Sequence, residues 1–185
     1  MFFKIKFYLS SIFLVECASP VALLANLPDS SLSADSSFIY NGDTVLHSEI
    51  HSRLHNSASG IGAWQSANTV DPWIQADLLN EYHVGGVATQ GRGGGLYEQW
   101  VTQYSVSFGL SEAQLAFVLD STGGRRIFAA NSERFQVVRN AFDAVRARIV
   151  RLHPTEWNEA PTMRWEVYGC ITGKLNIRHI PYALV

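Results

Sequence analysis

The sequence predicts an all-β domain, an antiparallel sandwich or barrel, from two observations. The first is a segment, residues 100–108, whose side chains alternate between two faces. One face carries Thr102, Tyr104, Val106 and Phe108. A period of two is typical of a half-buried strand. The second observation is that glycine-rich turns separate many short segments of β character, which favours short strands over long helices.

The composition allows one folded domain of this class. The chain has 185 residues, of which 47% are hydrophobic, 16% charged and 12% aromatic. That content is enough for a buried core and excludes disorder for most of the chain. The formal net charge of −2 provides no basic excess that would attract nucleic acid. Because the only long apolar run is N-terminal, we expect no transmembrane segment in the mature chain.

Further strands follow in chain order. Residues 26–37 are rich in Ser, Asp and Pro and are expected to be extended. Besides residues 100–108, strands are predicted over residues 73–78, 148–152 and 163–167. Residues 133–147 are equally compatible with a helix and with a strand followed by a turn. We expect Trp73, Trp100 and Trp165 to fill the core. Asp77 and Arg151 lie inside strand segments and need partners if they are buried.

The N-terminal residues 1–16 predict a secretory signal peptide. Lys4 and Lys6 precede a short apolar stretch that ends near Val15. A buried strand is the alternative. The domain itself is expected over residues 17–170.

Two cysteines, Cys17 and Cys170, lie near the ends of this domain. In an exported chain a widely spaced pair suggests a disulfide, and the alternative is two unrelated thiols. Residues 171–185 show no clear pattern and are expected to form a tail or linker.

The motifs of enzymes give no support for catalysis. The sequence has no Gly-x-Ser-x-Gly elbow and no phosphate-binding loop, and residues 91–95, although rich in glycine, indicate a loop tip. His47, His51 and His55 are spaced four apart, but no helical pattern would align them, so solvated loop histidines are favoured over a metal site. His153 is interpreted as structural. We expect no cofactor; a Ca²⁺ requirement does not follow from the sequence.

Several short motifs, taken in their order and spacing, resemble the discoidin family, also called the coagulation factor five/eight C-type domain. The resemblance covers residues 17–170. The motifs are Leu27-Pro28-Asp29-Ser30, Trp73-Ile74-Gln75-Ala76-Asp77-Leu78, Val84 to Arg92, Trp100 to Tyr104, Val150 to Pro154, and Arg164 to Cys170.

The resemblance implies an eight-stranded antiparallel jelly-roll-like sandwich whose ends are joined by a disulfide, here Cys17 with Cys170. It implies three ligand-binding loops at one end, near residues 38–47 (first loop), 54–64 (second loop) and 92–99 (third loop). The candidate ligand-binding residues on these loops are Phe38, Tyr40, Arg92, Leu96 and Tyr97. For three of them a structural role is the alternative: Phe38 in the core, Tyr97 against Trp100, Arg92 as a loop brace.

The resemblance further implies a secreted or extracellular, non-catalytic binding module. We expect cell adhesion or matrix recognition of a protein or glycan ligand. Ile39 beside Phe38 and Leu96 beside Arg92 also suit an anionic phospholipid membrane, the first alternative. Because the third loop is mostly glycine, this alternative ranks below a protein or glycan. A structural or oligomerising module is the second alternative.

Overall fold

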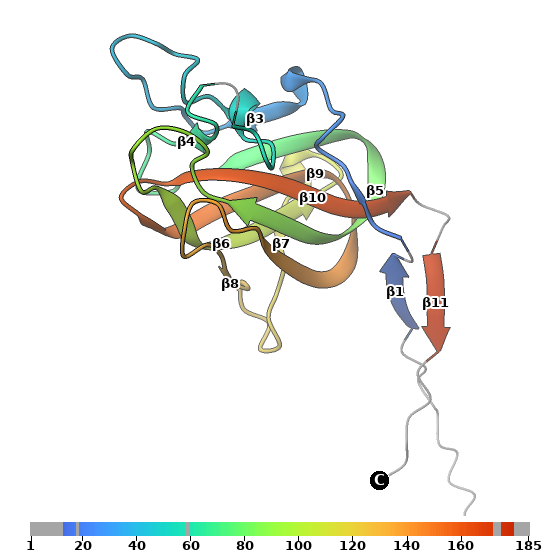
Figure 1. Ribbon diagram of the computed structural model, residues 1–185. Coiled ribbons are helices and arrows are strands. Elements are labelled where there is room, and N and C mark those ends of the chain that lie inside the picture. The colour runs from blue at the N-terminus through green and yellow to red at the C-terminus, as the bar shows by residue number, and fades with distance from the viewer. Residues whose placement is uncertain (1–12, 18, 58–59, 172–174, 180–185) are drawn as a thin grey trace, which may run out of the picture.

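The computed structural model describes residues 13–17, 19–57, 60–171 and 175–179, and it confirms the all-β class (Figure 1). The described residues form eleven strands: β1 (Phe13–Cys17), β2 (Val21–Ala22), β3 (Leu32–Ala34), β4 (Trp64–Gln65), β5 (Ile74–Gln90), β6 (Trp100–Gly109), β7 (Ala116–Phe117), β8 (Phe128–Ala129), β9 (Val138–Asn158), β10 (Thr162–Ile171) and β11 (Leu175–His179). Their helical turns are three 3-10 segments: η1 (Asp29–Ser31), η2 (Glu49–His51) and η3 (Glu112–Gln114).

Nine of these strands form one antiparallel sheet in the order β2-β10-β5-β9-β6-β7, with β3 paired to β5, β4 to β10 and β8 to β6. Strands β5 and β9 are long, 17 and 21 residues, and their pairing shifts register twice. Such irregularities bend a sheet, so the long strands wrap around one core. The strand count exceeds the expected eight because segments of two or three residues pair along the sides of the long strands.

The predicted strands lie within observed ones, except that Trp73 precedes β5, which begins at Ile74. Residues 148–152 are the middle of β9 and residues 163–167 the middle of β10. The ambiguous segment 133–147 is a strand from Val138 onward, because it pairs along β5.

The prediction of a half-buried β6 is wrong, since Ser105 and Ser107 on its polar face are also buried. Their hydroxyls have partners there. Ser107 Oγ is 2.9 Å from His153 Nε2, and Ser105 Oγ accepts from Arg125 Nε at 2.6 Å. His153 is therefore part of the framework, and burial, together with the charge of Arg125, lowers its pKa to about 4.

The core is filled by Trp165, as predicted, and by Trp64 and Tyr104, all fully buried. Trp73 and Trp100 are only half-buried, so their assignment to the core is wrong. The reason for Trp73 is local: its ring stacks on the guanidinium of Arg151 at 3.9 Å and covers that charge.

Asp77 and Arg151, the two strand residues expected to need partners, have them, and so does the buried Glu166. Asp77 forms a salt bridge with Arg148 at 2.8 Å, and Arg151 donates to the side-chain oxygen of Gln75. Glu166 is buried, and its carboxylate accepts backbone N–H groups of the segment before β3, including Leu24 at 2.6 Å. The outcome agrees with the rule that a buried charge must be bonded.

Strands β1 and β11 pair with each other in a separate ribbon that leads away from the sandwich, on the side away from β3 and β4 (Figure 1). Of the predicted signal peptide, residues 1–12 lie outside the described residues, and the rest belongs to β1. The Cys17 side chain also lies outside the described part, whereas Cys170 is buried on β10. The signal peptide and the disulfide stay predictions. Among the described residues, no helical segment is long and apolar enough to span a membrane.

Candidate functional site

The three loops named above lie side by side, joined by backbone hydrogen bonds. The N–H of Ile61 in the second loop donates to the carbonyl of Leu46 in the first at 3.0 Å. The N–H of Gly94 in the third loop donates to the carbonyl of Ile61 at 2.9 Å. The loops therefore form one continuous platform.

A glycine is required where the second and third loops touch. A Cβ on Gly93 would lie 2.5 Å from the carbonyl oxygen of Asn56 and 2.7 Å from that of Gly62. Real side chains do not approach backbone so closely, so only glycine allows this contact. The glycine-rich run is thus a packing surface as well as a loop tip.

A buried arginine on β10 holds the platform from below. Arg164 is 3% exposed and donates to three carbonyl oxygens: Gly91 at 2.7 Å, Asn56 at 2.9 Å and Arg134 at 3.1 Å. Burial, and then the charge of Arg134, lowers the pKa of its guanidinium to about 10. Sequence reasoning missed this role, because a single arginine between Met163 and Trp165 gives no signal of burial.

The first loop owes its shape to an Asn-Gly turn. Asn41 and Gly42 have positive φ values of 51° and 83°, and the N–H of Asp43 donates to the carbonyl of Tyr40 at 2.9 Å. Positive φ at both central residues is characteristic of a type I′ turn, which Asn-Gly strongly prefers. The Asp43 carboxylate then accepts the next backbone N–H groups, which lowers its pKa. The turn exposes Tyr40 on the surface.

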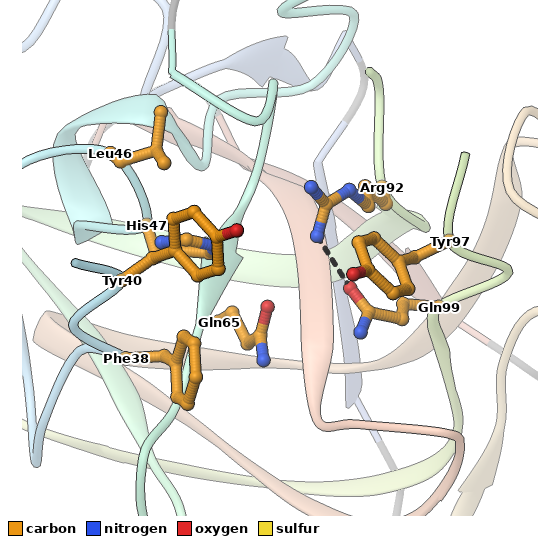
Figure 2. A pocket seen from close by; sticks show the side chains of 8 residues that line it. All are labelled: Phe38, Tyr40, Leu46, His47, Gln65, Arg92, Tyr97 and Gln99. Atoms are coloured by element: carbon orange, nitrogen blue, oxygen red, sulfur yellow. Dashed lines mark hydrogen bonds between the residues drawn. The ribbon is translucent and has the colours of Figure 1, made fainter. Parts of the chain in front are cut away.

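Together the first and third loops enclose a pocket of about 360 Å³, shown in Figure 2. Its lining side chains are Phe38, Tyr40, Leu46, His47, Gln65, Arg92, Tyr97 and Gln99. Four of the five predicted ligand-binding residues are thus brought together. Leu96 does not line the pocket; it projects from the third loop and is 96% exposed.

Arg92 lies at the base of the third loop rather than beside its tip. It is 7% exposed. Its guanidinium donates to the side-chain oxygen of Gln99 and the carbonyl of Gly94, both at 2.7 Å, and lies 5.1 Å from the centre of the Tyr97 ring. These bonds make it a loop brace that also lines the pocket, and burial lowers its pKa.

His47 forms the opposite wall and is 4% exposed. The Phe38 ring meets it edge-on at 5.2 Å, and its Nδ1 has no hydrogen-bond partner among the described residues. Burial, and then the charge of Arg92, lowers the pKa of His47. The interpretation as solvated loop histidines is wrong for His47 and His51, which are buried, and holds for His55, which is exposed.

Four lining residues were not predicted: Leu46, His47, Gln65 and Gln99. The two glutamines are largely buried, although nothing in their sequence context distinguishes them from surface residues. Of these two glutamines, only Gln99 has a signal in the sequence, because it lies at the end of the third loop. Among the described residues no group of three His, Cys, Asp or Glu side chains could hold a metal ion.

A larger hollow of about 670 Å³ lies between β6, β7 and β9, at another place in the fold. Its walls include Phe108, Phe117 and Phe142, and no predicted ligand-binding residue lines it.

A pocket held by end loops on an antiparallel β-sandwich defines a class of protein, the β-sandwich binding modules. Within this class the chain belongs to the F5/8 type C, or discoidin, family, whose domain it matches over residues 31–167. The predicted resemblance to that family is confirmed.

Known proteins agree with this assignment. Lactadherin of Mus musculus is 31% identical over 170 residues, which cover 90% of this chain and 36% of lactadherin. The structure of discoidin II from Dictyostelium discoideum has a TM-score of 0.68 at 27% identity and covers 83% of this chain and 59% of its own. CpGH89CBM32-5 of Clostridium perfringens, solved with GalNAc-β-1,3-galactose, shares the fold, with a TM-score of 0.57 at 12% identity over 82% of this chain and all (100%) of its own. The chain thus spans about a third of lactadherin and three fifths of discoidin II.

Proposed function

We propose that the domain is an extracellular, non-catalytic module that binds a glycan in the pocket of the first and third loops and so serves adhesion or matrix recognition. One observation carries the proposal. The pocket combines exposed aromatic rings with buried hydrogen-bonding side chains on a braced platform.

The aromatic rings suit the apolar face of a sugar. Tyr97 is 58% exposed and Phe38 and Tyr40 are also solvent-accessible, so their rings offer stacking surface. Aromatic side chains offer a flat apolar surface with a polar edge. Gln65 and Gln99 are fixed by burial. The Gln65 amide offers donors and an acceptor to hydroxyl groups, whereas the Gln99 amide, whose oxygen accepts from Arg92, offers its N–H donors. A concave site with few, well-placed polar groups is typical of small-ligand recognition.

The charge distribution favours a glycan over an anionic membrane. The three lysines of the chain are Lys4, Lys6 and Lys174, so none of them belongs to the three loops. The arginine of the third loop, Arg92, is buried, and Arg134 is occupied by Glu98 and by carbonyls of the third loop. A lipid surface would therefore meet few free cations.

The second candidate, peripheral binding to anionic membranes, rests on Leu96. This side chain is 96% exposed at the loop tip, and Ile39, Tyr40 and Tyr97 are also more than half exposed. Apolar loop tips of this kind can enter a membrane interface. Co-sedimentation with vesicles, with and without phosphatidylserine, separates the two candidates.

The test of the glycan proposal is a glycan array followed by titration calorimetry with the best glycan. Tyr97→Ser should weaken binding at least ten-fold without changing the thermal midpoint, because Tyr97 is largely exposed. Val70→Ser is the matched control, since Val70 is 92% exposed and lines neither cavity. An unchanged affinity of the Tyr97 variant, or vesicle binding without any glycan binding, would refute the proposal.

A further inference from the structure

The feature that extends the proposal is a buried cation without a counter-charge. Arg92 is 7% exposed, and every group it contacts is neutral: Gln99, Gly94 and the Tyr97 ring. The described residues form four ion pairs, through Arg53, Arg134, Arg146 and Arg148, and Arg92 takes part in none of them.

A buried charge without an opposite charge is costly. A buried guanidinium is stabilised either by a carboxylate, with which it forms parallel, charge-assisted hydrogen bonds, or by carbonyl oxygens that accept from all three of its nitrogens, as at Arg164. In Arg92 the Nε and Nη1 atoms donate to Gly94 and Gln99, and its Nη2 makes no hydrogen bond within the described residues. One side of the guanidinium is therefore left for a ligand in the pocket.

The carboxylates around the pocket do not fill this role. Asp43 accepts the backbone N–H groups of Val45 and Leu46, and Glu98 pairs with Arg134 at 3.4 Å. Glu159 is exposed and acts on Arg92 only through its electrostatic field, which opposes the lowering of the Arg92 pKa.

We infer that the glycan carries a carboxylate, as uronic and sialic acids do, and that this carboxylate binds the guanidinium of Arg92. The inference rests on the proposed function and names the substrate class of the same pocket. The sugar ring lies against Tyr97 and the aromatic rings of the first loop, and the carboxylate supplies the missing counter-charge.

The experiment compares sugars that differ in the acid group. The full chain is titrated calorimetrically with galactose and galacturonate, glucose and glucuronate, and lactose and sialyllactose. At least one acid should bind ten-fold or more tightly than its neutral parent. This ratio should fall as the salt concentration rises from 50 to 500 mM, because the Debye length then shortens by a factor on the order of three.

Three variants locate the preference. Arg92→Gln should bring the ratio of acid to neutral affinity close to one, whereas Arg92→Lys should keep part of it. Glu159→Gln removes a nearby negative charge from an exposed position, so it should raise the ratio two- to three-fold. Because Glu159 makes no hydrogen bond within the described residues, this variant remains informative even if Arg92→Gln does not fold.

The outcomes separate the inference from the proposal beneath it. Neutral sugars that bind as tightly as their acids refute the carboxylate and leave the glycan pocket standing. An acid preference that survives in Arg92→Gln also refutes the inference. If no sugar of any pair binds and the glycan array is blank, the proposed function falls, and the inference falls with it.

Discussion

Replacing Arg164 by methionine tests whether one buried side chain holds the loop platform together. Methionine keeps the apolar stem and the volume of the site but removes the donors to Gly91, Asn56 and Arg134. Each carbonyl that loses a buried partner costs about 1–3 kcal/mol. Removing the charge recovers part of its desolvation energy, so the net loss in the free energy of unfolding should be about 3–5 kcal/mol.

Urea unfolding, followed by tryptophan fluorescence, measures this loss. With an m-value of about 2 kcal/mol/M, the midpoint should fall by about 1.5–2.5 M. The matched control is Arg148→Met, which breaks an exposed pair with Asp77 and should cost far less stability than Arg164→Met, because exposed ion pairs contribute little. If the two variants lose the same stability, or if Arg164→Met stays as stable as the wild type, the bracing role is wrong.

Two further perturbations test the contacts around the platform. Burial raises the pKa of Glu166 above its ordinary value of 4.5, so the stability contributed by its neutral form is complete below pH 4.5 and is lost as pH rises through the folded pKa. The free energies of unfolding of the wild type and of Glu166→Gln are measured across pH 4–8. The variant should become more stable relative to the wild type as the pH increases, and a constant difference between the two free energies would contradict this. Gly93→Ala should cost about 1–3 kcal/mol and weaken glycan binding, because its Cβ meets backbone at 2.5 Å. The neighbouring Gly94→Ala, with its nearest atom at 3.5 Å, should be neutral in both assays, and equal effects would argue against the close contact.

Features governed by local sequence could be predicted well. Residues 100–108 form β6 because alternation is a property of neighbouring residues, and Asn41-Gly42 marks a turn because few other pairs tolerate two positive φ values. The resemblance to the discoidin family placed Phe38 and Tyr97 on loops that the structure brings to one pocket.

Features set by distant partners could not be predicted. Arg164 looks like a surface residue in sequence, and its burial depends on carbonyls 30, 73 and 108 residues away. Ser107 alternates as an outward residue, yet His153 and the segment around Phe117 cover it. Arg92 has the role of a loop brace, which was the alternative to a ligand contact, but its burial depends on its bonds to Gly94 and Gln99 and could not be predicted.

The separate ribbon of β1 and β11 has a practical consequence for how the domain can be presented. Both strands run beside each other, away from the loops, so an anchor fused to either one would leave the recognition face pointing outward (Figure 1). Several copies of the domain linked through the ribbon of β1 and β11 would present their pockets to the same surface. Several weak single-site contacts would then combine into a high overall avidity for a surface that carries many copies of the ligand.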